Sequence, residues 1–73
     1  MERSPRVLVV EDEENVRFVT VAALRQGDFE VHETASGREA LRIVADPAVT
    51  PDLVVLDVML PDLDGFEVCR RMR

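Results

Sequence analysis

The sequence predicts an α/β fold built on a parallel β-sheet, and three observations lead to this prediction. Two unbroken apolar runs, residues 7–10 and 53–56, have the length and β-branched content of strands buried on both faces. A third run, residues 29–32, alternates apolar and polar side chains, as a half-exposed edge strand does. Segments of helical periodicity follow each run. The order β-α-β-α-β-α favours parallel strands joined by right-handed crossovers.

The chain is short and acidic, with 73 residues and a formal net charge of -6. A chain of this length forms at most one domain, which hides only about 60% of the surface that the unfolded chain exposes. The negative charge argues against binding to nucleic acid, because a phosphate backbone selects basic surfaces. With a single cysteine, Cys69, and neither a signal peptide nor a long apolar span, we expect a reduced, cytoplasmic setting without membrane contact.

An acidic run follows the first predicted strand and opens a helix over residues 14–26. Asp12 is predicted to be its N-cap, with Glu13 and Glu14 near the first turn, where the helix dipole favours negative charge. Helical spacing predicts that the side facing the sheet consists of Val16, Val19, Thr20, Ala23 and Leu24. The outer side then carries Phe18, Val21 and Ala22. Apolar residues on an outer helix face indicate a cover or a partner.

Gly27 and Asp28 end the first predicted helix, since small residues of this kind commonly follow a helix C-terminus. Asp28 can adopt the left-handed conformation there at some cost in free energy. The edge strand that follows is expected to point His32 outward.

A capping box of the form S-x-x-E, Ser36 to Glu39, opens a second predicted helix. This helix is expected to bury Ala40, Leu41, Ile43 and Val44. Residues 46–51 are predicted to form a loop before the strand at residues 53–56. Asp64 and Glu67 repeat the capping pattern and predict a third helix.

The two apolar strands are expected to be neighbours in the middle of the sheet, with the alternating strand outside the first. This gives the spatial order 2-1-3. The direction in which the chain proceeds across the sheet reverses between strands 1 and 3, and a crevice forms at the carboxyl ends of these two strands. Glu11 and Asp12 leave one strand there, and Asp57 leaves the other. Clustered carboxylates repel one another unless protons or a cation neutralise them. Oxygen ligands in an open crevice fit magnesium, which often binds together with phosphate, so the cluster indicates phosphoryl chemistry.

Two other interpretations of the acids fail on residue identity. A calcium-binding EF-hand loop aligned on the motif D-L-D-G at residues 62–65 would need acidic ligands at its first and last positions, where Leu60 and Arg71 stand. An aspartate-nucleophile phosphatase would have a second acid two residues after Asp57, where Met59 stands.

Three stretches of the chain resemble the receiver domain of two-component response regulators. They are V-L-V-V-E-D-E at residues 7–13, S-G-R-E-A-L at residues 36–41, and P-D-L-V-V-L-D-V-M-L-P-D-L-D-G-F-E-V at residues 51–68. The third stretch is most similar to regulators of the winged-helix transcription-factor type. The resemblance implies a flavodoxin-like, doubly wound sheet, of which residues 1–73 would form the first three βα units, with the last two units absent.

The resemblance also implies roles for particular residues. Asp57 would be the phosphoacceptor, attacking the phosphohistidine of a sensor histidine kinase, so the protein would be a signalling phosphoprotein rather than an enzyme. Asp12 would bind magnesium directly and Glu11 directly or through water, with Asp57 and the backbone carbonyl of Met59 as further ligands. The kinase would meet the outer face of the first helix, formed by Glu14, Asn15, Phe18, Val21 and Ala22. Control of transcription would pass through an output domain outside this segment.

The chain departs from the family pattern in ways that leave a second function open. Receiver domains carry a hydroxyl residue and a lysine on later strands, and this sequence contains no lysine. Without those units, the strand at residues 53–56 becomes an edge able to pair with another chain. We therefore expect self-association through this strand or by segment exchange, unless the segment belongs to a longer chain. The alternative function is a non-catalytic interaction module that self-associates or binds a kinase.

Overall fold

The computed structural model describes residues 3–56 and residue 70. Within these residues the elements are β1 (Arg6–Val10), α1 (Glu14–Gln26), β2 (Glu30–Thr34), α2 (Gly37–Ala45) and β3 (Leu53–Leu56). The β-α-β-α-β order and the bounds of α1 are as predicted. The helix predicted to begin near Asp64 falls outside the described residues.

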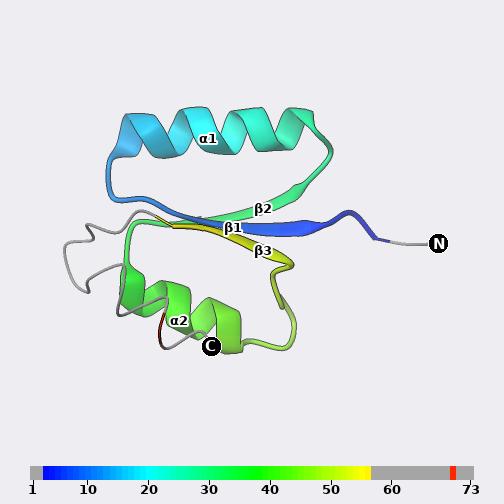
Figure 1. Ribbon diagram of the computed structural model, residues 1–73, viewed down its shortest axis with the longest axis vertical. Helices are drawn as coiled ribbons and strands as arrows, with labels where there is room; N and C mark the ends of the chain where they lie inside the picture. Colours follow the sequence, from blue (N-terminus) through cyan, green and yellow to red (C-terminus); the bar gives the residue numbers. More distant parts are fainter. Residues whose placement is uncertain (1–2, 57–69, 71–73) are drawn as a thin grey trace.

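The three strands form one parallel sheet in the order β2-β1-β3, which confirms the predicted order. Figure 1 shows α1 on one face of the sheet and α2 on the other. Val10, the last residue of β1, pairs with Thr34 of β2 and with Leu56 of β3. All three strands therefore end level with one another, and the residues that follow them leave from the same edge of the sheet.

β1 is the buried centre of the molecule. Its residues 7–10 have at most 1% of their surface exposed. Val7 and Val9 pack toward α1, whereas Leu8 and Val10 pack with Ala40 of α2, because successive side chains of a strand point to opposite faces. Burying a side chain of this size stabilises the fold by about 1.5–3 kcal/mol. The two clusters together hold both helices on the sheet.

The two helices begin with different caps. The hydroxyl of Ser36 accepts a hydrogen bond from the Glu39 N–H at 3.2 Å, as the capping box predicts. The N-cap of α1, however, is Glu13 and not Asp12. The Glu13 carboxylate accepts a hydrogen bond from the Asn15 N–H at 3.0 Å. The predicted cap is wrong because Glu11 still bonds to β2 through its N–H, so the chain turns into the helix one residue later.

The rotation of α1 about its axis also differs from the prediction. Val21 is buried, with 3% of its surface exposed, whereas Val16 and Val19 are 48% and 65% exposed. The row facing the sheet is Arg17, Val21 and Leu24, at the spacing of one helix face, and of these only Leu24 was predicted to face it. α1 carries apolar residues on nearly every side, so apolar spacing alone did not determine which side faces the sheet.

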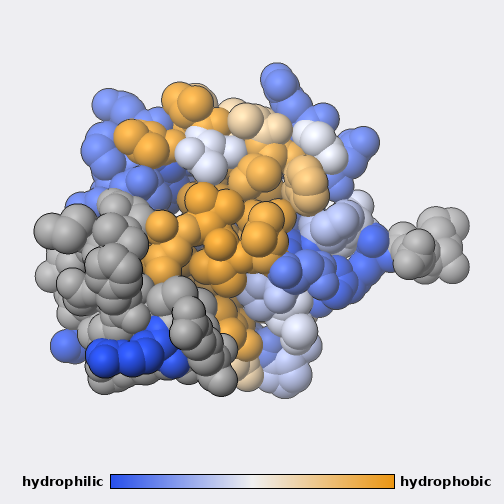
Figure 2. Space-filling view, in the orientation of Figure 1, coloured by the Kyte–Doolittle hydropathy of each residue, from blue (hydrophilic) through white to orange (hydrophobic). Residues whose placement is uncertain are grey.

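β3 is buried on one face only, which corrects the expectation of burial on both. Val54 and Leu56 join the cluster with α2, while Leu53 and Val55 are 55% and 38% exposed. α1 packs mainly over β1 and β2 and leaves this side of β3 uncovered among the described residues. Figure 2 shows the resulting band of apolar side chains, which runs from α1 over the β3 edge of the sheet.

Within the described part of the chain, two residues other than glycine have a positive φ. Asp28, at 64°, takes the left-handed position after α1, while Gly27 before it has an ordinary φ of -88°. Thr50, at 40°, lies in the loop before β3, where its N–H bonds to the Asp46 carbonyl at 3.1 Å. A β-branched residue in this region is strained.

Candidate functional site

The carboxyl edge of the sheet carries the first two residues of the predicted site. Glu11 and Asp12 follow β1 directly, and Val10 before them is paired with Leu56, the last residue of β3. Asp57 is the next residue in the sequence after Leu56. Asp57 and Met59 lie outside the described residues, so the convergence of the three carboxylates stays a prediction. The described part of the site is the turn that holds Glu11 and Asp12.

Glu11 is held through three of its groups. Its N–H donates a hydrogen bond to the Thr34 carbonyl at 3.0 Å, which extends the pairing of β1 with β2 by one step. Its carbonyl accepts a hydrogen bond from Nη1 of Arg17 at 2.9 Å. Oε2 of its carboxylate accepts a hydrogen bond from the Glu13 N–H at 3.2 Å. The turn is therefore tied to β2 and to α1 at once.

Asp12 is exposed, and its carboxylate makes no hydrogen bond or ion pair within residues 3–56. The shift of the helix cap to Glu13 is what leaves it available. An exposed carboxylate beside a second carboxylate suits magnesium, which binds through one or two protein carboxylates and keeps several waters. The described residues contain no group of three potential metal ligands. The donor set of Glu11 and Asp12 thus fits part of a magnesium site, and Asp57 is the predicted third acid.

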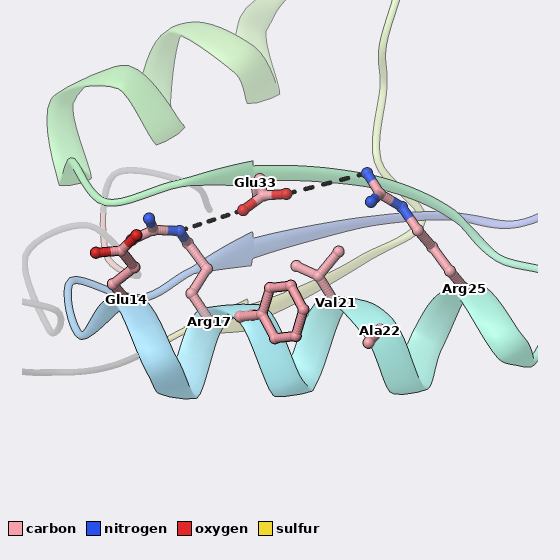
Figure 3. Close-up of a pocket in the computed structure, with 7 residues that line it drawn as sticks. Glu14, Arg17, Val21, Ala22, Arg25 and Glu33 are labelled. Carbon is pink, nitrogen blue, oxygen red and sulfur yellow. Dashed lines mark hydrogen bonds and ion pairs between the residues drawn. The ribbon is translucent and has the colours of Figure 1, made fainter.

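A shallow groove of about 190 Å³ lies between α1 and β2 and contains most of the predicted kinase-facing residues (Figure 3). It is lined by Glu14, Arg17, Phe18, Val21, Ala22, Arg25 and Glu33. Phe18 is 72% exposed, so an apolar side chain does face outward here. Val21 does not, because it is part of the core, and its place on the outer face was wrongly predicted. Asn15 is exposed but does not line the groove.

Three charged residues of this groove, Arg17, Arg25 and Glu33, were not predicted from the sequence. Nε of Arg17 lies 3.2 Å from Oε1 of Glu33, and Nη2 of Arg25 lies 4.0 Å from Oε2 of the same carboxylate. Figure 3 shows Glu33 between the two arginines. The predicted strand ended at residue 32, whereas β2 continues to Thr34 and carries Glu33 on the α1 face. Arg17 and Val21 are four residues apart and so lie on one face of a helix, which was the available sign in the sequence that Arg17 faces β2.

The amino edge of the sheet holds a separate ionic network. The Asp52 carboxylate accepts hydrogen bonds from Nη1 and Nη2 of Arg3 at 2.8 and 3.3 Å and from the Arg6 N–H at 2.8 Å. The hydrogen bond from Arg3, followed by that from the Arg6 backbone, lowers the pKa of Asp52 to about 2. These contacts join the start of β1 to the start of β3, so the network is structural.

His32 belongs to the amino-edge network as well. Its Nε2 lies 2.9 Å from Oε2 of Glu30, and Arg6 Nε lies 3.1 Å from the same oxygen. The hydrogen bond with His32, and then the charge of Arg6, lowers the pKa of Glu30. The half-exposed imidazole therefore has a structural partner at the edge of β2.

No helix within the described residues is long and apolar enough to cross a membrane.

Comparison with known proteins gives consistent matches. The family model described as "Response regulator receiver domain" matches residues 7–73. The chain is 44% identical over 69 residues to the transcriptional regulatory protein AfsQ1 of Streptomyces coelicolor, covering 94% of this chain and 30% of AfsQ1. It is 47% identical over 68 residues to the response regulator MprA of Mycolicibacterium vanbaalenii, covering 93% of this chain and 29% of MprA.

The fold matches solved structures equally well. The structure of the chemotaxis protein CheY4 of Vibrio cholerae aligns with a TM-score of 0.88 at 31% identity, over 96% of this chain and 57% of that one. The chain thus spans under a third of the two curated relatives and just over half of this solved structure.

Proposed function

The chain belongs to the response regulator receiver domain family, and from this premise we propose that it accepts a phosphoryl group on Asp57 from a sensor histidine kinase in a magnesium-dependent step. Residues 1–73 would form the first three βα units of the receiver. The relatives AfsQ1 and MprA are a transcriptional regulatory protein and a response regulator. We extend the proposal to control of transcription through an output domain and to action in the cytoplasm.

The main support for this proposal is the position of Glu11 and Asp12 in the sheet. The β1–α1 turn holds Glu11 and Asp12 at the carboxyl edge of the sheet, level with the end of β3, and Asp57 is the next residue of the chain. Ligands of open α/β sheets bind at this edge, at the point where the connections that leave two neighbouring parallel strands go to opposite sides of the sheet. The position of the acids relative to the strands thus supports phosphoryl chemistry independently of the family match.

The proposed reaction is an in-line transfer between two side chains. A carboxylate oxygen of Asp57 attacks the phosphorus of the kinase phosphohistidine and forms a P–O bond. The P–N bond breaks, and its electron pair returns to the imidazole. Asp12 and Glu11, with the Met59 carbonyl, would hold magnesium, which supplies positive charge against the phosphoryl oxygens. The protein is consumed stoichiometrically, so it acts as a phosphoacceptor and not as an enzyme.

Phosphorylation of the 73-residue chain tests the proposal. We expect incubation with phosphoramidate and magnesium to add one base-labile phosphoryl group, in low yield because the chain has no lysine to contact that group. Intact-mass spectrometry should show the adduct in the wild type and not in Asp57→Asn or in the presence of EDTA. An adduct that persists in Asp57→Asn would contradict the assignment of Asp57, and complete absence of an adduct would contradict activity in this segment.

The outer side of α1 is our proposed contact surface for the kinase. Phe18 is the most exposed large apolar residue among those described, and Glu14, Asn15 and Ala22 surround it on the exposed side of the helix. An exposed aromatic residue rimmed by polar residues is typical of the centre of a binding surface. Val21 is omitted from this surface because it is buried.

A non-catalytic interaction module is the second candidate, and the uncovered side of β3 favours it. Leu53 and Val55 are exposed, and β3 pairs only with β1 among the described strands. Such an edge is a template for pairing with another strand, for example from a second copy. Kinase binding retained by Asp57→Asn, together with absence of phosphorylation in the wild type, would favour this candidate over the first.

A further inference from the structure

Arg17 connects the candidate metal-binding turn to the rest of the fold. Its guanidinium donates from Nη1 to the Glu11 carbonyl at 2.9 Å and from Nε to Oε1 of Glu33 at 3.2 Å. The side chain is 21% exposed, so water screens these contacts less than those of a free surface arginine. One residue of α1 thus holds the turn after β1 and a carboxylate of β2 together.

The contact with Glu11 has a specific geometric effect. The Glu11 carbonyl belongs to the peptide group that joins Glu11 to Asp12, and this group is planar. A hydrogen bond that fixes the plane limits the rotation on both sides of it, and hence the directions in which the two acidic side chains leave the backbone. The bond from the Glu11 N–H to Thr34 fixes the preceding peptide group in the same way.

We propose that Arg17 is a positioning residue for the magnesium-binding acids, Glu11 and Asp12. The inference rests on the proposed function, since it concerns the same site. Arg17 does not reach the metal itself. It holds the peptide between the two acids at the angle at which both carboxylates can share one cation, and Glu33 in turn holds the guanidinium.

Arginine suits this role better than lysine. Its planar guanidinium presents several N–H donors in fixed directions, so it can bond to the Glu11 carbonyl and the Glu33 carboxylate at the same time. A lysine ammonium is a point charge on a flexible stem and would favour the carboxylate. We therefore expect Arg17→Lys to keep the ion pair and to lose much of the control over the peptide plane.

Magnesium affinity of the 73-residue chain, measured by isothermal titration calorimetry, tests the inference without any phosphoryl transfer. Loss of a residue that orients metal ligands typically weakens binding about 10-fold to 100-fold. We expect this loss in Arg17→Met and a smaller loss in Arg17→Lys. The matched control is Arg25→Met, which removes the weaker contact to the same Glu33 carboxylate, at 4.0 Å, and leaves the bond to Glu11 intact. It should bind magnesium like the wild type.

The outcomes separate this inference from the proposed function. Wild-type affinity in both Arg17 variants would overturn the inference and leave the function standing. If the wild type binds no more magnesium than Asp12→Asn does, both the function and the inference fall. If Arg17→Met does not fold, the test uses Arg17→Lys alone. Weaker magnesium binding by Arg17→Lys at an unchanged free energy of unfolding would support the positioning role of Arg17, and unchanged magnesium binding would overturn that role.

Discussion

Two acids at opposite ends of the sheet differ in how their carboxylates are bonded. Asp52 at the amino edge accepts three hydrogen bonds, which join the starts of β1 and β3. Asp12 at the carboxyl edge has none within the described part of the chain. An ionised carboxylate satisfied by donors gains little from a cation, whereas an unsatisfied one can bind it. The contrast supports assigning ligand binding to the edge that carries Asp12.

The shifted pKa of Asp52 gives a prediction about pH. Because the folded-state pKa, about 2, lies below the ordinary value of 3.8, this group adds stability that is present above pH 4 and is lost as the pH falls toward 2. NMR titration of the side-chain carboxyl should give a value near 2 in the wild type and a higher value in Arg3→Ala. Titration of wild-type Asp52 near its ordinary value would contradict the network.

The sequence predicted some residues of the candidate site and not others, for a physical reason. Glu11 and Asp12 could be found because β1 is strongly apolar, so its end is sharp and the acids stand out. Arg17 and Glu33 act as a pair that joins a helix to a strand, and neither partner is distinctive alone. Their meeting depends on the rotation of α1 and on the length of β2, and both were predicted incorrectly.

At the level of elements, α1 shows the limit of apolar periodicity. Its valines and alanines occupy most sides of the helix, so several rotations would bury similar apolar area. The observed rotation also satisfies Glu33, which lies on the α1 face of β2 and receives Arg17 and Arg25. Pairing of charges at the rim thus helps to select one of several apolar packings. By contrast, α2 is amphipathic, and the side predicted to face the sheet does so. Ala40 is buried, and Ile43 and Val44 are partly buried against it, whereas Leu41, also predicted to be buried, is only partly covered and lies outside this cluster.

Two valines of α1 provide a direct test of its rotation. Val21→Ala should lower the unfolding free energy by about 2 kcal/mol, because it removes buried methyl groups beside Val7 and Val9. Val19→Ala, at a site 65% exposed, should change it by less than about 0.5 kcal/mol. Urea unfolding of the two variants checks the prediction. The reverse order of effects would mean that Val19 faces the sheet.

At the scale of the whole molecule, the sheet formed by residues 6–56 has two unlike edges. The β2 edge carries charged and polar residues, Glu30, His32 and Glu33 among them, which discourage pairing with other strands. The β3 edge consists of four apolar residues and lies within the apolar band of Figure 2. We therefore expect any association between copies of the chain to use the β3 edge.

Substitutions on β3 test whether the chain associates through that side. We expect sedimentation velocity of the 73-residue chain to show a sedimentation coefficient that rises with concentration. The double variant Leu53→Thr/Val55→Thr places β-branched residues, which suit a strand, at both positions and removes exposed apolar surface, so it should weaken the association. Phe18→Ser, at a more exposed apolar site on α1, is the control. A compact wild-type monomer at all concentrations would refute this mode of association.

The topology could be predicted almost completely, because a parallel sheet imposes strong constraints. Three strands separated by helices permit few arrangements, and the two fully apolar runs had to be neighbours. Burial could not be predicted to the same degree. Leu53 and Val55 have the composition of buried residues, and nothing within their own strand indicates that α1 packs mainly over β1 and β2.

The central position of β1 has a consequence for how the protein is made. Translation delivers β1 first, yet its partners are β2 and, much later in the sequence, β3. Until both have been synthesised, the most apolar strand of the molecule has unpaired backbone groups and no cover for its valines. Contacts so distant in sequence also form slowly. During synthesis, β1, whose end carries the acidic turn, therefore waits for both β2 and β3 before its pairing is complete.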